Sequence, residues 1–273
     1  RENSNQRANR ENIQMPYTRN DGVDIWYETC GQGPAITFLH GRAGNAASWW
    51  RQVAHFSKTH TVTVFDQRGF GRSPCMRDDF RADALSGDVA AVLDAAGVTR
   101  PLLVSQSMGG ISAMRFARDC PERLAGLIVS SSMAGIVPMD IRRRLAELER
   151  ANTVTLPDRA FAPGYNDREP ALYELYKQIL SFNTAFDPGW RARIAGPDQS
   201  FGAKDFNSYA VPTTFVVGEH DQFFPPNFVH EIAAWVPGAT VIDMPDVGHS
   251  PYWESPDAFN ETIRNWMSEN AVW

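Results

Sequence analysis

Short apolar runs alternate with helical stretches along most of the 273-residue chain, and this alternation most constrains the fold. The runs, rich in β-branched and aromatic residues, predict strands at 23–29, 35–40, 62–66, 102–105, 124–131, 213–218 and 240–244. Helical patterns occupy 81–96, 109–118, 226–235 and 256–269. Several of the runs are continuously apolar, which is typical of strands covered on both faces. We therefore expect an α/β fold with a mostly parallel central sheet and helices on both faces.

One long segment, from about 133 to 207, interrupts this alternation and contains no strand pattern. Helical patterns at 141–150 and 169–180 are separated by turns rich in proline and glycine. The segment is also rich in aromatic residues, namely Phe161, Tyr165, Tyr173, Tyr176, Phe182, Phe186 and Trp190. We expect an all-helical cap over 133–208, inserted into a core formed by 15–132 and 209–273. The almost wholly polar residues 1–14 are predicted to be a flexible extension.

The composition is that of an ordinary globular protein, with 43% apolar and 21% charged residues. A net charge of −6 gives no reason to expect a nucleic acid or a polybasic contact with membranes as a partner. No stretch approaches the roughly 18 apolar residues of a membrane span. We expect a small-molecule substrate as the partner. The sequence leaves the oligomeric state open, a homo-oligomer included.

Three cysteines, Cys30, Cys75 and Cys120, are widely spaced and form no CxxC pair. This pattern argues against a zinc site and against a disulfide framework, and it favours a reducing, cytoplasmic location. The glycine pair at 109–110 lacks the lysine of a phosphate-binding P-loop, and no G-x-G-x-x-G occurs. We expect neither a cofactor nor a metal.

The segment LLVSQSMGG, residues 102–110, leaves a predicted strand and enters a helix through small residues. A G-x-S-x-G elbow places a serine at the apex of such a turn, with small neighbours that let strand and helix approach. Here Ser105 replaces the first glycine, and it is expected to pack. Ser107 stands at the helix N-terminus, where backbone N–H groups favour negative charge. Ser107 is either a helix cap or a nucleophile, and the loops described next favour the nucleophile.

A serine nucleophile needs a base, and the base needs a carboxylate that orients it. His249 lies between the last predicted strand and the last helix, in a loop at the carboxyl edge of the sheet. Asp221, in GEHDQFFPP, follows another predicted strand at the same edge. We predict Ser107 as nucleophile, His249 as base and Asp221 as acid.

Three other residues compete for these roles. Glu219 and Asp246 are rivals of Asp221, and His220 is a rival base that we expect to point away. An acid after the earlier strand is disfavoured, because SSSMAG offers no carboxylate there.

The loop after the second predicted strand, FLHGRAG, is the candidate oxyanion hole together with the elbow. We predict the backbone N–H groups of Arg42 and Met108 as its two donors. The Arg42 side chain is expected to face solvent or support the loop, with a substrate carboxylate as the alternative partner. His40 is expected to support the loop structurally. Asp66 and Arg68 are expected to be turn and packing residues rather than catalysts.

Five blocks in this order resemble the α/β-hydrolase superfamily: FLHG with Trp49, FDQRGFGRSP, the S-M-G-G elbow, GEHDQFFPP and VGHSPYWESPDAFN. The resemblance runs from about residue 23 to the last helix and points to lid-bearing serine hydrolases that cleave esters, lactones or carbon–carbon bonds. It implies the α/β-hydrolase fold and the same nucleophile, base, acid and backbone donors that the residues suggest. The serine at 105 departs from the elbow motif.

The function expected from these features is cofactor-free hydrolysis of a carboxylic ester or lactone through an acyl-enzyme. The main alternative is cleavage of a carbon–carbon bond in a vinylogous diketo acid, as in relatives that act on meta-cleavage products. Those relatives often carry Trp after the histidine, where this chain has Ser250, and a cap arginine, for which Arg191 or Arg193 could stand. A non-catalytic small-molecule receptor on the same fold is the third possibility. Predicted substrate contacts are Trp49, Tyr173, Tyr176, Phe182 and Trp190.

Overall fold

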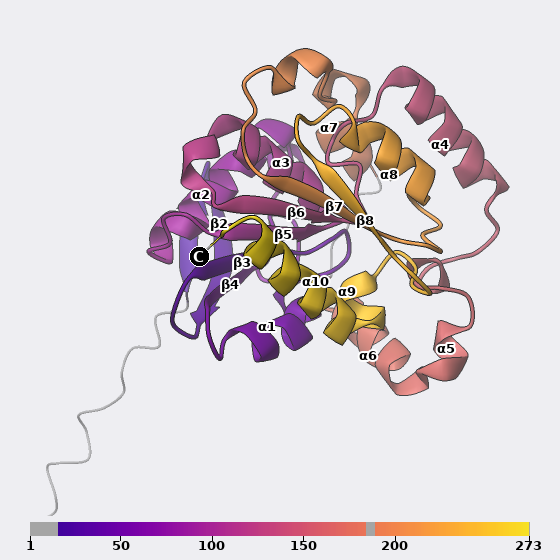
Figure 1. Ribbon diagram of the computed structural model, residues 1–273, viewed down its shortest axis with the longest axis horizontal. Helices are drawn as coiled ribbons and strands as arrows, with labels where there is room; N and C mark the ends of the chain where they lie inside the picture. Colours follow the sequence, from indigo (N-terminus) through magenta and orange to yellow (C-terminus); the bar gives the residue numbers. More distant parts are fainter. Residues whose placement is uncertain (1–15, 184–188, 273) are drawn as a thin grey trace, which may run out of the picture.

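The computed structural model describes residues 16–183 and 189–272. An eight-stranded sheet runs through the molecule in the order β1-β2-β4-β3-β5-β6-β7-β8 (Figure 1). Its strands are β1 Tyr17–Asn20, β2 Val23–Cys30, β3 Ala35–Leu39, β4 Thr61–Phe65, β5 Leu102–Gln106, β6 Gly126–Ser130, β7 Thr213–Gly218 and β8 Thr240–Met244. β2 pairs antiparallel with both β1 and β4, and every pairing from β4 to β8 is parallel. The predicted α/β class and mostly parallel sheet are confirmed.

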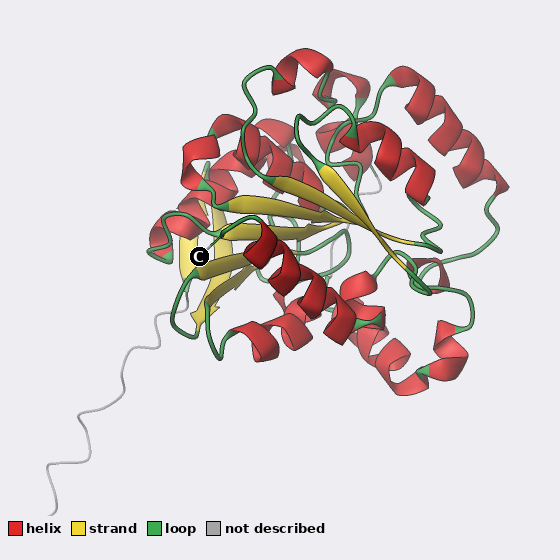
Figure 2. Ribbon diagram, in the orientation of Figure 1, coloured by secondary structure: helices red, strands yellow, loops and turns green. Residues whose placement is uncertain are grey.

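The helices flank the sheet on both sides, as Figure 2 shows in red and yellow. Their bounds are α1 Trp50–Phe56, α2 Leu85–Ala95, α3 Gly109–Asp119, α4 Met139–Ala151, α5 Tyr165–Arg168, α6 Pro170–Ser181, α7 Trp190–Ala195, α8 Pro226–Ala233, α9 Pro251–Glu254 and α10 Pro256–Glu269. Successive side chains of the central strands alternate between two cores. Leu103 and Val129 pack under α2, α3 and α8, whereas Val104 and Ile128 pack under α1 and α10. This two-sided burial explains why these strands are continuously apolar.

The elements that were not predicted from the sequence include β1 and α1, besides the short helices α5, α7 and α9. β1 is a short edge strand whose residues alternate between exposed and partly buried, so it lacks an apolar run. α1 buries only two of its residues and carries no side-chain cap at its start. Neither pattern gives the apolar periodicity that identified the other elements.

Between β6 and β7 the described residues form helices α4 to α7 and turns, without a strand. α6 packs against the turn that precedes α1, and Ile194 of α7 joins Met108 and Ile111 in a small core beside α3. The insertion is therefore held against the body from two sides. The cap boundaries at 133 and 208 stay a prediction, and the predicted extension 1–14 lies outside the described residues.

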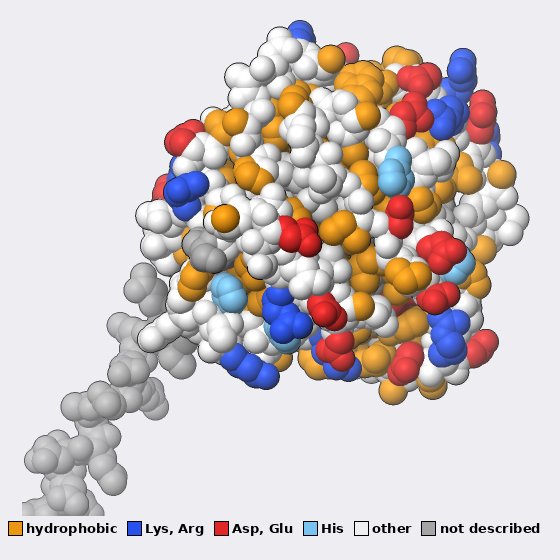
Figure 3. Space-filling view, in the orientation of Figure 1, with side chains coloured by type: hydrophobic (Ala, Val, Ile, Leu, Met, Phe, Trp, Pro, Cys, Tyr) orange, Lys and Arg blue, Asp and Glu red, His pale blue; other side chains and the backbone are white. Residues whose placement is uncertain are grey.

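Among the described residues, no helix has both the length and the apolar character needed to cross a bilayer. On the face shown in Figure 3, basic side chains lie among acidic and apolar ones and do not gather into one patch.

Candidate active site

Ser107 lies in the turn between β5 and α3, with a backbone φ of +50°. This left-handed conformation is rare for a residue with a side chain and costs on the order of 1 kcal/mol or more. The turn is tight on both sides. A Cβ atom at Gly109 would lie 2.5 Å from the Leu39 carbonyl oxygen, and one at Gly110 would overlap the Ser132 hydroxyl. The two glycines therefore let α3 approach β3 and the end of β6, which presents Ser107 at the apex.

Ser105, the departure from the elbow motif, is fully buried and donates a hydrogen bond to the Ile128 carbonyl at 3.2 Å. Its hydroxyl is satisfied inside the sheet, in agreement with the packing role predicted. The backbone N–H of Ser107 donates to the Ser130 carbonyl at 2.9 Å, which ties the turn to β6.

The structure brings Ser107, His249 and Asp221 together from three separate loops. The Ser107 Oγ lies 3.0 Å from His249 Nε2, and His249 Nδ1 lies 3.0 and 2.9 Å from the two carboxylate oxygens of Asp221. His249 and Asp221 are 7% and 3% exposed, so the hydrogen bond between them is shielded from water, whereas the contact between Ser107 Oγ and His249 is only partly buried. With Nδ1–H donating to the carboxylate, Nε2 is left as an acceptor for the serine hydroxyl.

Backbone donors hold Asp221 in place. Its Oδ1 accepts the N–H groups of Phe223 and Phe224 at 2.8 and 3.0 Å. The rings of the same two residues lie 4.6 and 5.6 Å from the His249 imidazole. The FFPP sequence after Asp221 thus fixes the carboxylate through its backbone and packs the imidazole through its side chains. Sequence reasoning missed both phenylalanines, although their position two and three residues after the acid was a usable signal.

The His249 loop is anchored by two further side chains. Gln106 Nε2 donates to the His249 carbonyl at 3.0 Å. The Glu254 carboxylate accepts the Gly248 N–H at 2.8 Å and, with its other oxygen, the Ala162 N–H at 2.7 Å. Burial raises the pKa of Glu254 above its ordinary value, while these N–H donors act in the opposite direction. Glu254 therefore joins the histidine loop to the segment before α5.

The loop after β3 approaches the elbow closely. A Cβ atom at Gly41 would overlap the Gln106 side-chain oxygen, so only glycine fits there without displacing Gln106. His40 fixes the loop: its Nδ1 lies 2.8 Å from the Gly41 carbonyl, and its Nε2 accepts the Gln67 N–H at 2.9 Å. This is the structural role expected of His40. Its pKa is lowered, first by burial.

Met108 is the N-cap residue of α3, and within the described residues its backbone N–H donates no hydrogen bond to protein. Helix N-terminal N–H groups are ready donors to an anion. Arg42 follows Gly41 on the opposing loop. The roles of the Met108 and Arg42 N–H groups as an oxyanion hole stay a prediction.

Two cavities meet at Ser107. The first, of about 280 Å³, is called the apolar cavity here; most of its lining is hydrophobic, from α3, the end of β6 and the insertion. Its lining includes Met108, Ile111, Met133, Val137, Leu145, Ala146 and Ala195. The second, of about 370 Å³, is called the polar cavity; its lining includes Arg42, Gln106, Thr155, Arg159, Tyr176 and His249. Both cavities share Ser107, Glu149, Trp190, Arg191, Phe223 and Phe224.

Two of the five predicted aromatic contacts line these cavities. Trp190 lines both, and Tyr176 lines the polar one. Trp49 is instead fully buried, with its ring 4.9 Å from Phe38 and 4.5 Å from Tyr252, so its expected place at the substrate is corrected to a place in the core.

Tyr173 and Phe182 also line neither cavity. The Tyr173 hydroxyl donates to Asp158, and 63% of the Phe182 side chain is exposed. The helical spacing of Tyr173 and Tyr176 predicts that they share one face of the helix. It does not determine which of the two rings lines a cavity. Phe186 lies outside the described residues.

The Arg42 side chain is partly buried and lines the polar cavity. Its guanidinium carbon lies 6.0 Å from the centre of the Trp190 ring. Burial, followed by the nearby charge of Arg191, lowers the pKa of Arg42. Sequence alone could not decide between the two orientations, because the insertion that covers this side chain is distant in the chain.

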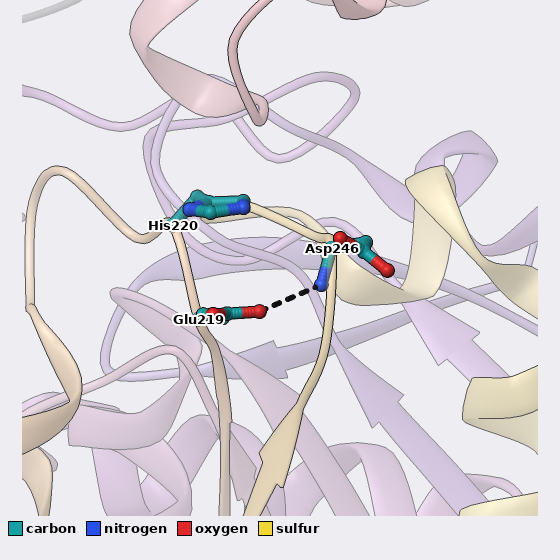
Figure 4. A group of neighbouring side chains, drawn as sticks. All are labelled: Glu219, His220 and Asp246. Carbon is teal, nitrogen blue, oxygen red and sulfur yellow. Dashed lines mark hydrogen bonds between the residues drawn. The ribbon is translucent and has the colours of Figure 1, made fainter.

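The rival residues Glu219, His220 and Asp246 lie together at the ends of β7 and β8, as Figure 4 shows. One ligand atom from each lies within 4.8 Å of the others, which is a geometry that a metal ion could use, but all three are exposed. Glu219 accepts the Asp246 N–H at 3.2 Å. Asp221, not these acids, contacts His249.

Comparison with known proteins adds a family and a set of relatives. A family model described as the alpha/beta hydrolase fold matches residues 34–256. A 2-hydroxy-6-oxononadienedioate/2-hydroxy-6-oxononatrienedioate hydrolase of Klebsiella pneumoniae is 27% identical over 266 residues, which cover 89% of this chain and 91% of that protein.

Two solved structures are similar over nearly the whole chain. A thermophilic esterase from Thermogutta terrifontis is 25% identical, with a TM-score of 0.77, over 93% of this chain and 98% of that one. Est816, an N-acyl homoserine lactone degrading enzyme, is 30% identical, with a TM-score of 0.73, over 92% of this chain and 99% of that one.

Proposed function

Because the chain belongs to the family with the alpha/beta hydrolase fold, we propose that it is a serine hydrolase that cleaves a carboxylic ester or lactone through an acyl-enzyme. The observation that carries the proposal is the continuous hydrogen-bonded chain from Ser107 Oγ to His249 to Asp221, with links of 3.0 and 2.9 Å. These contacts meet the geometric requirements for a nucleophile, a base and a group that orients the base. The chemistry proposed uses these groups of the chain and one water molecule.

In the first half of the reaction, His249 Nε2 takes the proton from Ser107 as the oxygen attacks the substrate carbonyl. Asp221 keeps Nδ1 protonated and stabilises the imidazolium that forms. His249 then gives the proton to the leaving alcohol oxygen, and Ser107 remains acylated. In the second half, His249 takes a proton from water, the resulting hydroxide attacks the acyl-enzyme, and the acid leaves as Ser107 regains its proton.

Negative charge develops on the carbonyl oxygen in both halves of the reaction. The N–H groups of Met108 and Arg42 are proposed to donate to it from the two sides of the elbow. The start of α3 adds the favourable end of the helix dipole.

Two relatives favour an ester or a lactone as the substrate. One is named an esterase and another an enzyme that degrades N-acyl homoserine lactones, and the 30% identity of the latter is the highest among the proteins reported above. The name esterase describes hydrolysis of a bond between an acyl group and an alkoxide oxygen, which is the bond that this mechanism breaks, and a lactone contains a bond of the same kind.

Cleavage of a carbon–carbon bond is the second candidate function. The relative from Klebsiella pneumoniae is named for a hydroxy-oxo-dienedioate, which is a vinylogous diketo acid. Arg191, the possible counterpart of a cap arginine, lines both cavities, whereas Arg193 lines neither. Ser250 in place of the usual tryptophan argues against this candidate.

A fluorophosphonate probe followed by peptide mass spectrometry tests the proposal. We expect a single adduct on the peptide that contains Ser107, and none in Ser107→Ala. Turnover of p-nitrophenyl butanoate and of a vinylogous diketo acid is then compared at equal enzyme concentration. Preference for the ester supports the proposal, and preference for the diketo acid replaces it with the second candidate. Absence of both an adduct and turnover contradicts it and favours a receptor.

A further inference from the structure

One arginine of the insertion contacts the loop that carries the acid of the triad. We propose that Arg159 is a positioning residue: by holding the residues after the acid, it keeps the His249 imidazole in the orientation that accepts the Ser107 proton. The inference rests on the proposed serine hydrolase function and extends it to the part that the insertion plays in the reaction.

The contacts of Arg159 lead to the residue that follows the acid. Arg159 is 5% exposed; its Nη1 lies 2.8 Å from a carboxylate oxygen of Glu149, and its Nη2 donates to the Gln222 carbonyl at 3.2 Å. The side-chain oxygen of Gln222 accepts from the Asn152 amide at 3.3 Å. Gln222 directly follows Asp221. The insertion therefore holds the acid loop through both the backbone and the side chain of one residue.

The same guanidinium also contacts the next residue of the loop. Its carbon lies 4.1 Å from the centre of the Phe223 ring, and that ring lies 4.6 Å from the centre of the His249 imidazole. Phe223 also donates its backbone N–H to the Asp221 carboxylate at 2.8 Å. A cation over an aromatic face is attracted to it, which restricts the position of the ring. Arg159 thus acts on the base and on the acid through Phe223.

A stabilising role alone does not account for Arg159. Replacement of a buried ion pair by apolar residues is often neutral or favourable for stability. What an arginine adds over an apolar side chain is direction, because its planar fork aims separate donors at a carboxylate and at a carbonyl. The Glu149 side chain is half exposed, so its carboxylate stays hydrated when Arg159 is replaced, and such a variant should fold.

The first test compares Arg159→Met with the wild type in hydrolysis of p-nitrophenyl butanoate. Methionine keeps a long side chain but loses the charge and the donors. Because His249 acts in both halves of the reaction, both should slow together, so kcat should fall by about 10- to 100-fold while KM stays within about twofold. Arg159 also lines the polar cavity, and a role in substrate binding would instead raise KM at an unchanged kcat. That result would overturn the proposal.

A double-variant cycle with Phe223→Leu distinguishes positioning from a general loss of structure. Leucine keeps the backbone N–H that binds Asp221 but removes the ring between the guanidinium and the imidazole. If Arg159 acts through Phe223, the loss of kcat in the double variant should be smaller than the product of the two single losses. Losses that multiply would contradict this route.

Arg159→Lys provides a rescue, because lysine keeps a charge over the Phe223 ring but cannot make both of the other contacts. Its kcat should exceed that of Arg159→Met by about threefold, the size of an exposed cation–π contact, and stay below that of the wild type. A lysine variant no faster than the methionine variant, or one as fast as the wild type, argues against the proposal.

Arg144→Met is the matched control. Arg144 of α4 also joins the insertion to the body: it pairs with Glu231 of α8 at 2.7 Å, and its guanidinium carbon lies 4.5 Å from the centre of the Phe228 ring (Figure 1). It lines neither cavity. We expect unchanged kcat and KM in this variant. A loss of kcat equal to that in Arg159→Met would show that any contact between insertion and body has this effect, and it would overturn the proposal.

The rate at which a fluorophosphonate labels Ser107 separates this inference from the proposed function. Labelling needs the same proton transfer to His249, so it should slow in Arg159→Met by about the factor seen in kcat. If labelling and kcat are the same in Arg159→Met and the wild type, only this inference fails. If neither protein is labelled and the ester is not hydrolysed, the proposed function itself fails.

Discussion

At the scale of single residues, the site depends on backbone conformations that its side chains do not favour. Ser107 has a φ of +50°, and the neighbouring loop bends at Ala43 with a φ of +63°. Such strain is kept where the surrounding packing determines it. Here that packing consists of the close approaches of Gly41, Gly109 and Gly110 to neighbouring segments.

Replacing Ser107 separates its chemistry from its strain. Ser107→Ala and Ser107→Gly should both lower kcat by at least ~10⁴-fold, because each removes the nucleophile. Ser107→Gly should also be more stable than Ser107→Ala by up to about 1 kcal/mol, since glycine adopts a positive φ without a steric cost. Urea unfolding of the two variants measures this difference. Equal stability would show that the turn is not strained.

Gly41→Ala tests the contact between the loop and the elbow. The added methyl group must displace the end of the Gln106 side chain, which holds the His249 carbonyl. We expect kcat/KM to fall by about 10- to 100-fold with little loss of stability, because a shift of about 1 Å at a catalytic group has effects of this size. Gly202→Ala is the control, since a Cβ there meets only Asp205 at 3.8 Å. Full activity in Gly41→Ala would refute this coupling.

His40 gives a pH-dependent prediction. Folding lowers the pKa of His40 from its ordinary value of about 6.5, which applies to the unfolded chain. As the pH falls through 6.5, the unfolded chain therefore binds a proton at His40 more readily than the native protein does. The stability that His40 contributes is therefore fully present above pH 6.5 and is lost as the pH falls. The difference in unfolding free energy between the wild type and His40→Gln should shrink between pH 7 and pH 5. A difference that grows on acidification would contradict the neutral, buried imidazole.

At the scale of elements, Glu254 connects α9 to both the histidine loop and the segment before α5. A glutamine at this position keeps one carbonyl oxygen, so it can replace only one of the two carboxylate oxygens as an acceptor. Glu254→Gln should lower kcat by about 10- to 100-fold and change KM little, because His249 shifts while the cavities remain. Steady-state kinetics measure the two constants. Glu261→Gln, exposed on α10, should keep normal kinetics; equal kinetics in both variants would refute the role of Glu254.

The elements of the core were predictable because each satisfies a local rule. Continuous apolar runs identified the parallel strands, and small residues after β5 identified the elbow. β1 and α1 were missed because their stability comes from contacts with neighbours rather than from their own periodicity. The place predicted for Trp49 was wrong, and the orientation of the Arg42 side chain stayed open in the sequence, since both depend on packing between segments that are far apart in the chain.

At the scale of the whole molecule, the insertion and the body share one core. Phe161 and Tyr176 from the insertion belong to the same buried cluster as Phe259 and Trp266 of α10. Phe161 is 1% exposed, and its ring lies 4.5 Å from Tyr165 and 4.7 Å from Tyr176. The active-site cavities are therefore enclosed by parts that should unfold together.

Phe161→Ala tests this cooperativity. Removal of the ring should destabilise the protein by about 3–5 kcal/mol in a single transition, because it leaves a cavity where insertion and body meet. Tryptophan fluorescence and far-UV circular dichroism should report coincident unfolding curves. Phe182→Ala, 63% exposed, should change stability by less than about 0.5 kcal/mol. Two separate transitions in Phe161→Ala would show that the insertion unfolds independently.

The central claim is that Ser107 is acylated by the substrate with His249 as the base. Rapid acid quenching during hydrolysis of p-nitrophenyl butanoate, followed by mass spectrometry, measures this directly. We expect a gain of one butanoyl group on the peptide that contains Ser107, absent in Ser107→Ala and slow to form in His249→Ala. Acylation of another residue, or undiminished turnover by Ser107→Ala, would contradict it.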